Sequence, residues 1–397
     1  MIEKIKMEKA FVYAGALIFP IANAKVSSLV FLLAFLTWAG KKIFGGKPVS
    51  ISTLDISAIA FFFVNVVGSL FSYDPVSCFK QLVMLSSLIG AYFVISNEFD
   101  KGEIRVLLMF IFFSSAIPVL YGYYQSGASA GNQDLWIDRS INPDLETRIY
   151  SFFTNPNIYG EYLVNTFFIG LALIASNKTK IGKFLLALLC IAITHQIVLT
   201  YSRGAWITYA AGLGIFLFAY NWKFIAAFVP LGIAGAAFSP PVVRQRLASI
   251  LSGFQDSSFY YRVEIWKNAF EMVKDYGLTG LGYGYQSFHQ YYAHYKMPGY
   301  NATHSHNLYL QVWLESGIMG FVLFMYIAAS SVFYNVRAIT KTGIRGSFKE
   351  LTSLTIIFAI LLHGLIDYTL FDYRICFQFW LALSLTAFAS KEKRLGR

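Results

Sequence analysis

The chain has 397 residues, of which 56% are hydrophobic, 18% aromatic and only 13% charged. Soluble domains carry about 25% charged residues, so this composition excludes an ordinary soluble protein and indicates an all-α, polytopic membrane protein built as one integral domain over 1–397. The net charge is +11, but the basic residues are scattered between apolar segments. We therefore expect membrane lipid, and no nucleic acid, as the partner.

Apolar segments recur along the whole chain. Because about 20 apolar residues form one membrane-crossing helix, we expect about twelve transmembrane helices. Their windows are 10–23, 26–44, 54–71, 79–96, 104–123, 157–175, 181–200, 204–220, 223–239, 317–336, 351–371 and 373–389. Lysines and arginines concentrate in alternate connections, so the positive-inside rule predicts that the N- and C-termini are both cytoplasmic. We expect no cleavable signal peptide, because the first apolar segment lacks a clear cleavage site.

Two external loops are long enough to fold. The smaller covers 124–156, and the larger covers 239–303, between the ninth and tenth spans. Residues 259–276 of the larger loop have helical periodicity. On a helical wheel, Arg262 lies in the middle of the apolar face of this helix. It either extends to lipid headgroups or points toward an anionic ligand near the helix N-terminus.

Two more arginines lie at the expected external membrane boundary. Arg203 occupies a tight turn between two spans, where it is either a lipid anchor or a ligand-binding group, and the adjacent Gly204 allows close approach. Arg148 precedes another span, together with Asn157, and is either a surface residue of a capping turn or a further ligand contact. Converging guanidinium groups favour a diphosphate, whose oxygens they bind bidentately.

A base is expected at His306, which stands beside Asn307 where the large external loop re-enters a span. An imidazole at a water boundary exchanges protons near neutral pH. His304 precedes it, but positions i and i+2 of a helix point apart and no carboxylate at ligand spacing joins them, so we expect no metal.

Charged side chains within or at the ends of spans are costly and usually paired. Either Glu161 or Glu315 is expected near the external face, where it could orient His306. His363 and Asp367 are four residues apart and, on one helical face, could satisfy each other.

These residues resemble the recurring blocks of the O-antigen ligase and polymerase superfamily. His306-Asn307, nine further residues, Gly317, two residues and Gly320 fit the histidine block of that family. Further similar blocks are the turn 201–204, the segment 148–157, and Arg262 with Trp266 and the glycine turn 280–282. The resemblance covers roughly residues 140–330.

The resemblance implies a metal-independent, cofactor-free glycosyltransferase of the type-C kind in the bacterial cytoplasmic membrane, with its active site on the periplasmic or extracellular face. Such enzymes move a glycan from undecaprenyl diphosphate to an acceptor. It assigns Arg203 and Arg262 to the diphosphate and His306 to deprotonation of the acceptor hydroxyl. Arg148, Asn157, Asn307, Glu161 and Glu315 are supporting candidates.

Ligase and polymerase share these blocks and differ only in the acceptor. The acceptor is a lipid A core or other surface saccharide for a ligase, which we favour, and a second lipid-linked glycan for a polymerase. A transporter or flippase would also suit twelve spans. It predicts two related halves with ionisable groups near mid-membrane, whereas here no internal repeat is evident and the notable charges gather at one face.

Overall fold

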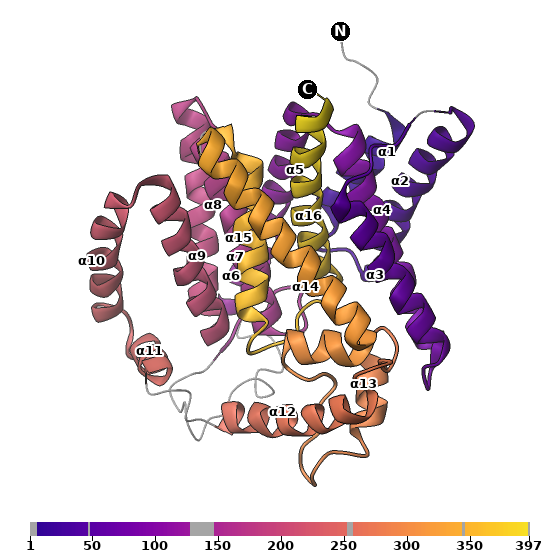
Figure 1. Ribbon diagram of the computed structural model, residues 1–397. Coiled ribbons are helices and arrows are strands. Elements are labelled where there is room, and N and C mark those ends of the chain that lie inside the picture. Colours follow the sequence, from indigo (N-terminus) through magenta and orange to yellow (C-terminus); the bar gives the residue numbers. More distant parts are fainter. Residues whose placement is uncertain (1–5, 47, 128–146, 252–256, 344–345, 396–397) are drawn as a thin grey trace.

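The computed structural model describes residues 6–46, 48–127, 147–251, 257–343 and 346–395, and within these ranges the secondary structure is helical, without strands (Figure 1). The helices are α1 (Met7–Ile18), α2 (Ala24–Phe44), α3 (Thr53–Leu70), α4 (Pro75–Glu98), α5 (Lys101–Ser114), α6 (Ala116–Gly127), α7 (Pro156–Ser176), α8 (Lys180–Leu199), α9 (Arg203–Asn221), α10 (Lys223–Ala237), α11 (Pro241–Leu251), α12 (Ser257–Tyr276), α13 (Tyr285–Tyr292), α14 (Leu308–Thr342), α15 (Phe348–His363) and α16 (Tyr373–Leu395). The expected all-α class is confirmed.

Seven helical stretches of the described chain are long and apolar enough to cross a membrane. They are α2, α3, α4, the stretch 101–127 formed by α5 and α6, α7, α8 and α14. Among the other five expected spans, α1, α10 and α15 are shorter. Helices α9 and α16 have 19 and 23 residues but do not reach the mean hydropathy expected of a membrane-crossing helix. A multi-pass membrane protein is thus supported, whereas the count of twelve spans is not confirmed.

Helix α7 lies at the centre of the bundle, where it packs against α5, α8, α9, α15 and α16. Polar side chains join it to α16. The amide of Asn165 donates to the Gln378 side chain at 2.9 Å, and both residues are fully buried. Between membrane helices such hydrogen bonds add to close packing, because lipid offers polar groups no alternative partner. Helix α7 therefore provides a fixed support for residues at its N-terminal end.

The helices of the segment 239–303, expected to be the larger external loop, gather at one end of the bundle. In Figure 1, α12 and α13 lie across the lower end, whereas the start of α1 and the end of α16 lie at the upper end. Both ends of the described chain are therefore on the side opposite these helices, while the cytoplasmic location of the termini stays a prediction. Helix α12 covers the helix expected over 259–276, and α11 and α13 are additional. The smaller loop expected over 124–156 lies largely outside the described residues.

Helix α14 bends at Gly317, whose φ of 64° is left-handed. The glycine turn at Gly280 crosses this bend so closely that a Cβ atom on Gly280 would lie 2.6 Å from the Gly317 backbone nitrogen. The neighbouring backbone amides of Leu281 and Gly282 donate to the carbonyls of Leu314 and Glu315. Glycine at both positions thus lets the glycine turn pack directly against the bend of α14.

Candidate active site

His306 lies in the loop that leads into α14, and its backbone has a left-handed φ of 49°. Asn307 caps α14, since its Oδ1 accepts the amides of Tyr309 and Leu310, each at 3.0 Å. The Asn307 side chain also donates to the carbonyl of Leu365 at 3.0 Å. From the other side, the Trp266 indole of α12 donates to the His306 carbonyl at 3.1 Å. Three parts of the chain therefore fix the position of this imidazole.

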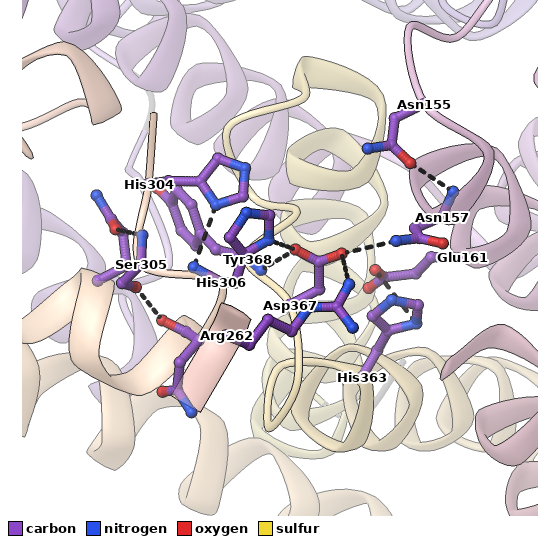
Figure 2. Close-up of polar contacts among 12 residues, drawn as sticks. Asn155, Asn157, Glu161, Arg262, His304, Ser305, His306, His363, Asp367 and Tyr368 are labelled. Atoms are coloured by element: carbon purple, nitrogen blue, oxygen red, sulfur yellow. Dashed lines mark hydrogen bonds and ion pairs between the residues drawn. The ribbon is translucent and has the colours of Figure 1, made fainter. Parts of the chain in front are cut away.

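The partner of His306 is Asp367, in the segment between α15 and α16. Nδ1 of His306 lies 2.9 Å from Oδ1 of Asp367. The other carboxylate oxygen accepts from Asn157 at 3.1 Å and forms an ion pair with Arg262 at 3.5 Å. Figure 2 shows this carboxylate between the three side chains. The His306 side chain keeps 23% of its surface exposed, so part of the imidazole is accessible from outside the protein.

Asp367 is held in its ionised form, whereas His304 is held in its neutral form. Burial opposes ionisation of Asp367, but His306, with its hydrogen bond, and Arg262 outweigh it and hold the pKa of this carboxyl well below its usual range. Burial lowers the pKa of His304 to about 3, and the charges of His306 and Arg262 act in the same direction. His304 is therefore neutral near pH 7, and its Nδ1 accepts the backbone amide of His306 at 3.2 Å. A neutral imidazole thus supports the turn that carries the base.

Glu315 and Glu161 do not contact His306, although either was expected to orient it. Glu315 accepts from Gln311 at 2.9 Å and from the Gly284 amide at 3.2 Å, so it anchors the glycine turn rather than orienting His306. Glu161 faces His363, with Oε2 3.7 Å from Nδ1. The expected mutual pairing of His363 and Asp367 was wrong, because α15 ends at His363 and the chain then turns. The Asp367 carboxylate instead contacts His306, Asn157 and Arg262.

His304, His306 and Asp367 also bring metal-ligand atoms within 4.8 Å of one another. The argument that the two histidines point apart was wrong, because they lie in a loop before α14 and their ring centroids are 4.2 Å apart. The carboxylate is already shared by His306, Asn157 and Arg262. A divalent cation here would meet the repulsion of nearby guanidinium groups. The donor set therefore fits a hydrogen-bonded base better than a metal ion.

Four arginines line one small cavity beside Asp367. They are Arg148, Arg203, Arg246 and Arg262. The rest of the lining comes from Asn157, Ser202, Gly204, Ser258, His363, Ile366 and Asp367. The volume is about 40 Å³, enough for about three waters and so for one phosphate-sized anion. The cavity brings together all three arginines singled out from the sequence and adds Arg246.

Local structure explains how these arginines are placed. Arg203 is the first residue of α9, whose N-cap is Ser202, and it is only 6% exposed. The Arg148 guanidinium donates to the Thr200 carbonyl at 2.9 Å and to Asn157 Oδ1 at 3.0 Å. Arg246 of α11 donates to the Tyr201 carbonyl at 3.1 Å. The turn between α8 and α9 thereby anchors two of the guanidinium groups.

The electrostatics of the cavity favour an anion. Burial, together with the charges of Arg246, Arg262 and Arg203, lowers the pKa of Arg148 to about 9. This mutual repulsion is relieved when an anion enters. Asn157, Arg203 and Ser258 also belong to the first turns of α7, α9 and α12, where helix dipoles favour negative charge. The site can thus hold an oxyanion next to an oriented imidazole.

Sequence reasoning missed one contributor to this site, Arg246, and did not identify the role of another, Asp367. Arg246 is one of two arginines in a segment with no recognised helix, whereas the structure shows α11 there. Asp367 was noticed, but apolar residues on both sides made the span window run on to 371, past the true end of α15. The sequence signal that could have identified Asp367 is its position in an apolar segment, because a carboxylate there normally requires a cationic or hydrogen-bonding partner.

Comparison with known proteins finds similarity in the middle of the chain. Residues 184–325 match a family model described as O-antigen ligase, and they include Arg203, Arg262 and His306. The resemblance drawn from the sequence is thereby confirmed. An uncharacterized protein of Haemophilus influenzae is 27% identical over 159 residues, covering 35% of this chain and 40% of that protein. The alignment thus spans less than half of this curated relative.

Proposed function

We propose, from the match to the O-antigen ligase family, that the chain is a membrane glycosyltransferase that moves a glycan from a polyprenyl diphosphate, such as undecaprenyl diphosphate, to a hydroxyl acceptor. The observation that carries the proposal is the His306–Asp367 pair beside a cavity lined by four arginines. The reaction needs a base for the acceptor and cations for the leaving diphosphate. Both lie at the same end of the bundle.

The reaction follows from this arrangement. Asp367 binds Nδ1 of His306 and keeps Nε2 available as the base, which is how a carboxylate fixes the tautomer of a catalytic histidine. Nε2 removes the acceptor proton while the acceptor oxygen attacks the anomeric carbon of the donor. The bond between that carbon and the diphosphate oxygen breaks. Guanidinium groups in fixed positions stabilise the growing charge on the diphosphate.

The proposed chemistry needs no metal, because the arginines supply the positive charge that a cation would otherwise provide. We place the active site on the external face of the cytoplasmic membrane, since the positive-inside rule puts the large loop outside. The partners are then the lipid-linked donor, a saccharide or lipid-linked acceptor and membrane lipids. Turnover that continues in excess EDTA would support metal independence, and turnover lost in EDTA and restored by a divalent cation would contradict it.

The decisive experiment supplies purified protein with an undecaprenyl diphosphate-linked glycan and one of two acceptors. A ligase extends a lipid A core, whereas a polymerase of the same family extends a second lipid-linked glycan. We expect transfer to the lipid A core. His306→Ala should abolish transfer to either acceptor while the protein still binds undecaprenyl diphosphate. Retained turnover in this variant would remove His306 as the base.

A further inference from the structure

The cavity adjoins a second histidine–carboxylate pair, which the mechanism above does not use. His363 ends α15 and lines the cavity, and Glu161 of α7 lies behind it. Figure 2 shows the two side chains facing each other on the far side of Asp367 from His306. His363 Nδ1 is 3.7 Å from Glu161 Oε2. The opposite edge of the imidazole faces the start of α9, because a Cβ atom on Gly204 would lie 3.3 Å from Nε2.

The environment of this pair contrasts with that of His306 and Asp367. The side chains of His363 and Glu161 are only 1% and 0% exposed. Within the described part of the chain, Nδ1 of His363 and both Glu161 oxygens lack a well-aligned hydrogen bond, and the Thr369 side chain faces the Glu161 carboxyl group. An ionised carboxylate left so enclosed and without well-aligned hydrogen bonds would be very costly. The stable resting form is a carboxylic acid beside a neutral imidazole.

Two histidine–carboxylate pairs thus border one anion cavity. The carboxyl group is ionised in one pair and protonated in the other. Asp367 is ionised and keeps His306 ready to accept a proton, whereas Glu161 retains a proton that it can pass on. Enzymes commonly obtain an acid and a base in one active site by giving two titratable groups different environments, so that one holds a proton and the other does not. The leaving diphosphate gains charge during transfer, which creates a need for a proton on its side of the site.

We propose that His363 and Glu161 form a proton relay to the departing diphosphate, an inference that rests on the proposed transferase function. As the bond between the anomeric carbon and the diphosphate oxygen breaks, its electron pair stays on that oxygen. The oxygen takes the proton from Nε2 of His363, while Nδ1 takes the proton of Glu161. The acceptor proton meanwhile passes to His306. Water then removes the proton from His306 and returns one to Glu161.

Other charged groups face His363 and Glu161 and influence which of the two holds the proton. Asp367 and Arg262 lie toward His363, and Asp367 and Asp372 lie toward Glu161. Arg148, Arg203 and Arg246 line the same cavity. The arginines disfavour a permanent imidazolium before the donor binds. A relay through a neutral imidazole avoids that charge, and the gap of 3.7 Å has to close in the donor complex, as catalytic contacts commonly do.

The test measures kcat and KM for the wild type, His363→Gln and Glu161→Gln, with undecaprenyl diphosphate binding as a second readout. Both variants should lower kcat by about 100-fold, with donor KM and undecaprenyl diphosphate affinity near wild type. The solvent isotope effect on kcat, measured in H2O and D2O, should be larger in the wild type than in either variant, because fewer protons move when the relay is broken. His195→Gln is the matched control, because His195 of α8 contacts Tyr123 and is absent from the cavity lining.

A wild-type kcat in His363→Gln, or a solvent isotope effect unchanged from the wild type, would overturn the relay and leave the transferase function intact. A raised KM with unchanged kcat would indicate a structural role and would also overturn it. No transfer by the wild type to either acceptor would overturn the proposed function and the relay together. If the variants do not fold, single-turnover rates of the wild type in mixtures of H2O and D2O decide. Several protons in flight support the relay, and one proton contradicts it.

Discussion

His306 and Asp367 are 61 residues apart in the chain, yet Nδ1 of one lies 2.9 Å from Oδ1 of the other. Their meeting depends on backbone contacts next to each residue. The amide of Leu308 donates to the carbonyl of Gly364 at 2.8 Å, and the Asn307 side chain donates to the carbonyl of Leu365. The start of α14 is thereby joined to the turn after α15. The orientation of the base is thus built into the packing of two helices.

Asp367→Asn should lower kcat by about 100-fold, because an amide no longer stabilises the imidazolium that forms when His306 accepts a proton. It also weakens the contact with Arg262. Initial rates at saturating donor and acceptor measure the effect. Glu271→Gln is a suitable control, since Glu271 is exposed on α12 and pairs only with Lys274 in the described structure. Equal rates for the wild type and Asp367→Asn would refute the role of this carboxylate.

Arg246→Ala and Arg244→Ala should behave differently although the residues are neighbours on α11. Arg246 lines the cavity and binds the Tyr201 carbonyl, whereas exposed Arg244 binds the carbonyls of Ala237 and Ser239. Losing one charge-assisted contact to phosphate costs about 1.5–3 kcal/mol, so Arg246→Ala should weaken undecaprenyl diphosphate binding by roughly tenfold or more. Arg244→Ala should bind as the wild type does. Equal affinities for the two variants would exclude Arg246 from the anion site.

Arg203→Lys keeps the charge but should still impair transfer, because lysine cannot form the planar, bidentate contact of a guanidinium with phosphate oxygens. We expect a roughly tenfold loss in kcat/KM for the donor, corresponding to about 1.4 kcal/mol. Arg105→Lys is the control, since Arg105 binds the Ser176 carbonyl away from the cavity. Near-normal kinetics for Arg203→Lys would favour the lipid-anchor interpretation of this residue.

The sequence was informative where a residue type and its place along the chain carry the signal together. Arg203 in a turn and His306 before a span could both be found, because polar groups at a membrane boundary stand out against apolar neighbours. The helix over 259–276 was equally evident from its periodicity. These are local properties, and most of the helical architecture follows from them.

Partner identity could not be predicted in the same way. Glu161, Glu315 and Asp367 all lie near ends of apolar segments, and sequence offers no means of choosing which one meets His306. The choice depends on where α15 ends and how its following turn contacts Asn307, which are tertiary contacts. Arg246 was missed for a related reason, because α11 brings it to the cavity by packing against α9.

The buried imidazole of His304 should make the stability of the protein depend on pH. Its pKa is about 3 in the folded protein and 6.5 in its unperturbed form, so the unfolded state binds the proton more readily. The stabilising contribution is complete above pH 6.5 and is lost progressively as the pH falls toward 3. Between pH 6.5 and 4 the loss should reach up to about 3 kcal/mol.

His304→Asn provides the comparison, because the asparagine Oδ1 can accept the His306 amide but does not titrate in this range. We expect the melting temperature of the wild type to fall more steeply than that of His304→Asn between pH 6.5 and 4. The stability difference between them should therefore narrow as the solution becomes more acidic. Thermal unfolding in detergent, followed by tryptophan fluorescence at each pH, measures it. Parallel pH profiles for the two proteins would show that His304 is not held neutral by burial.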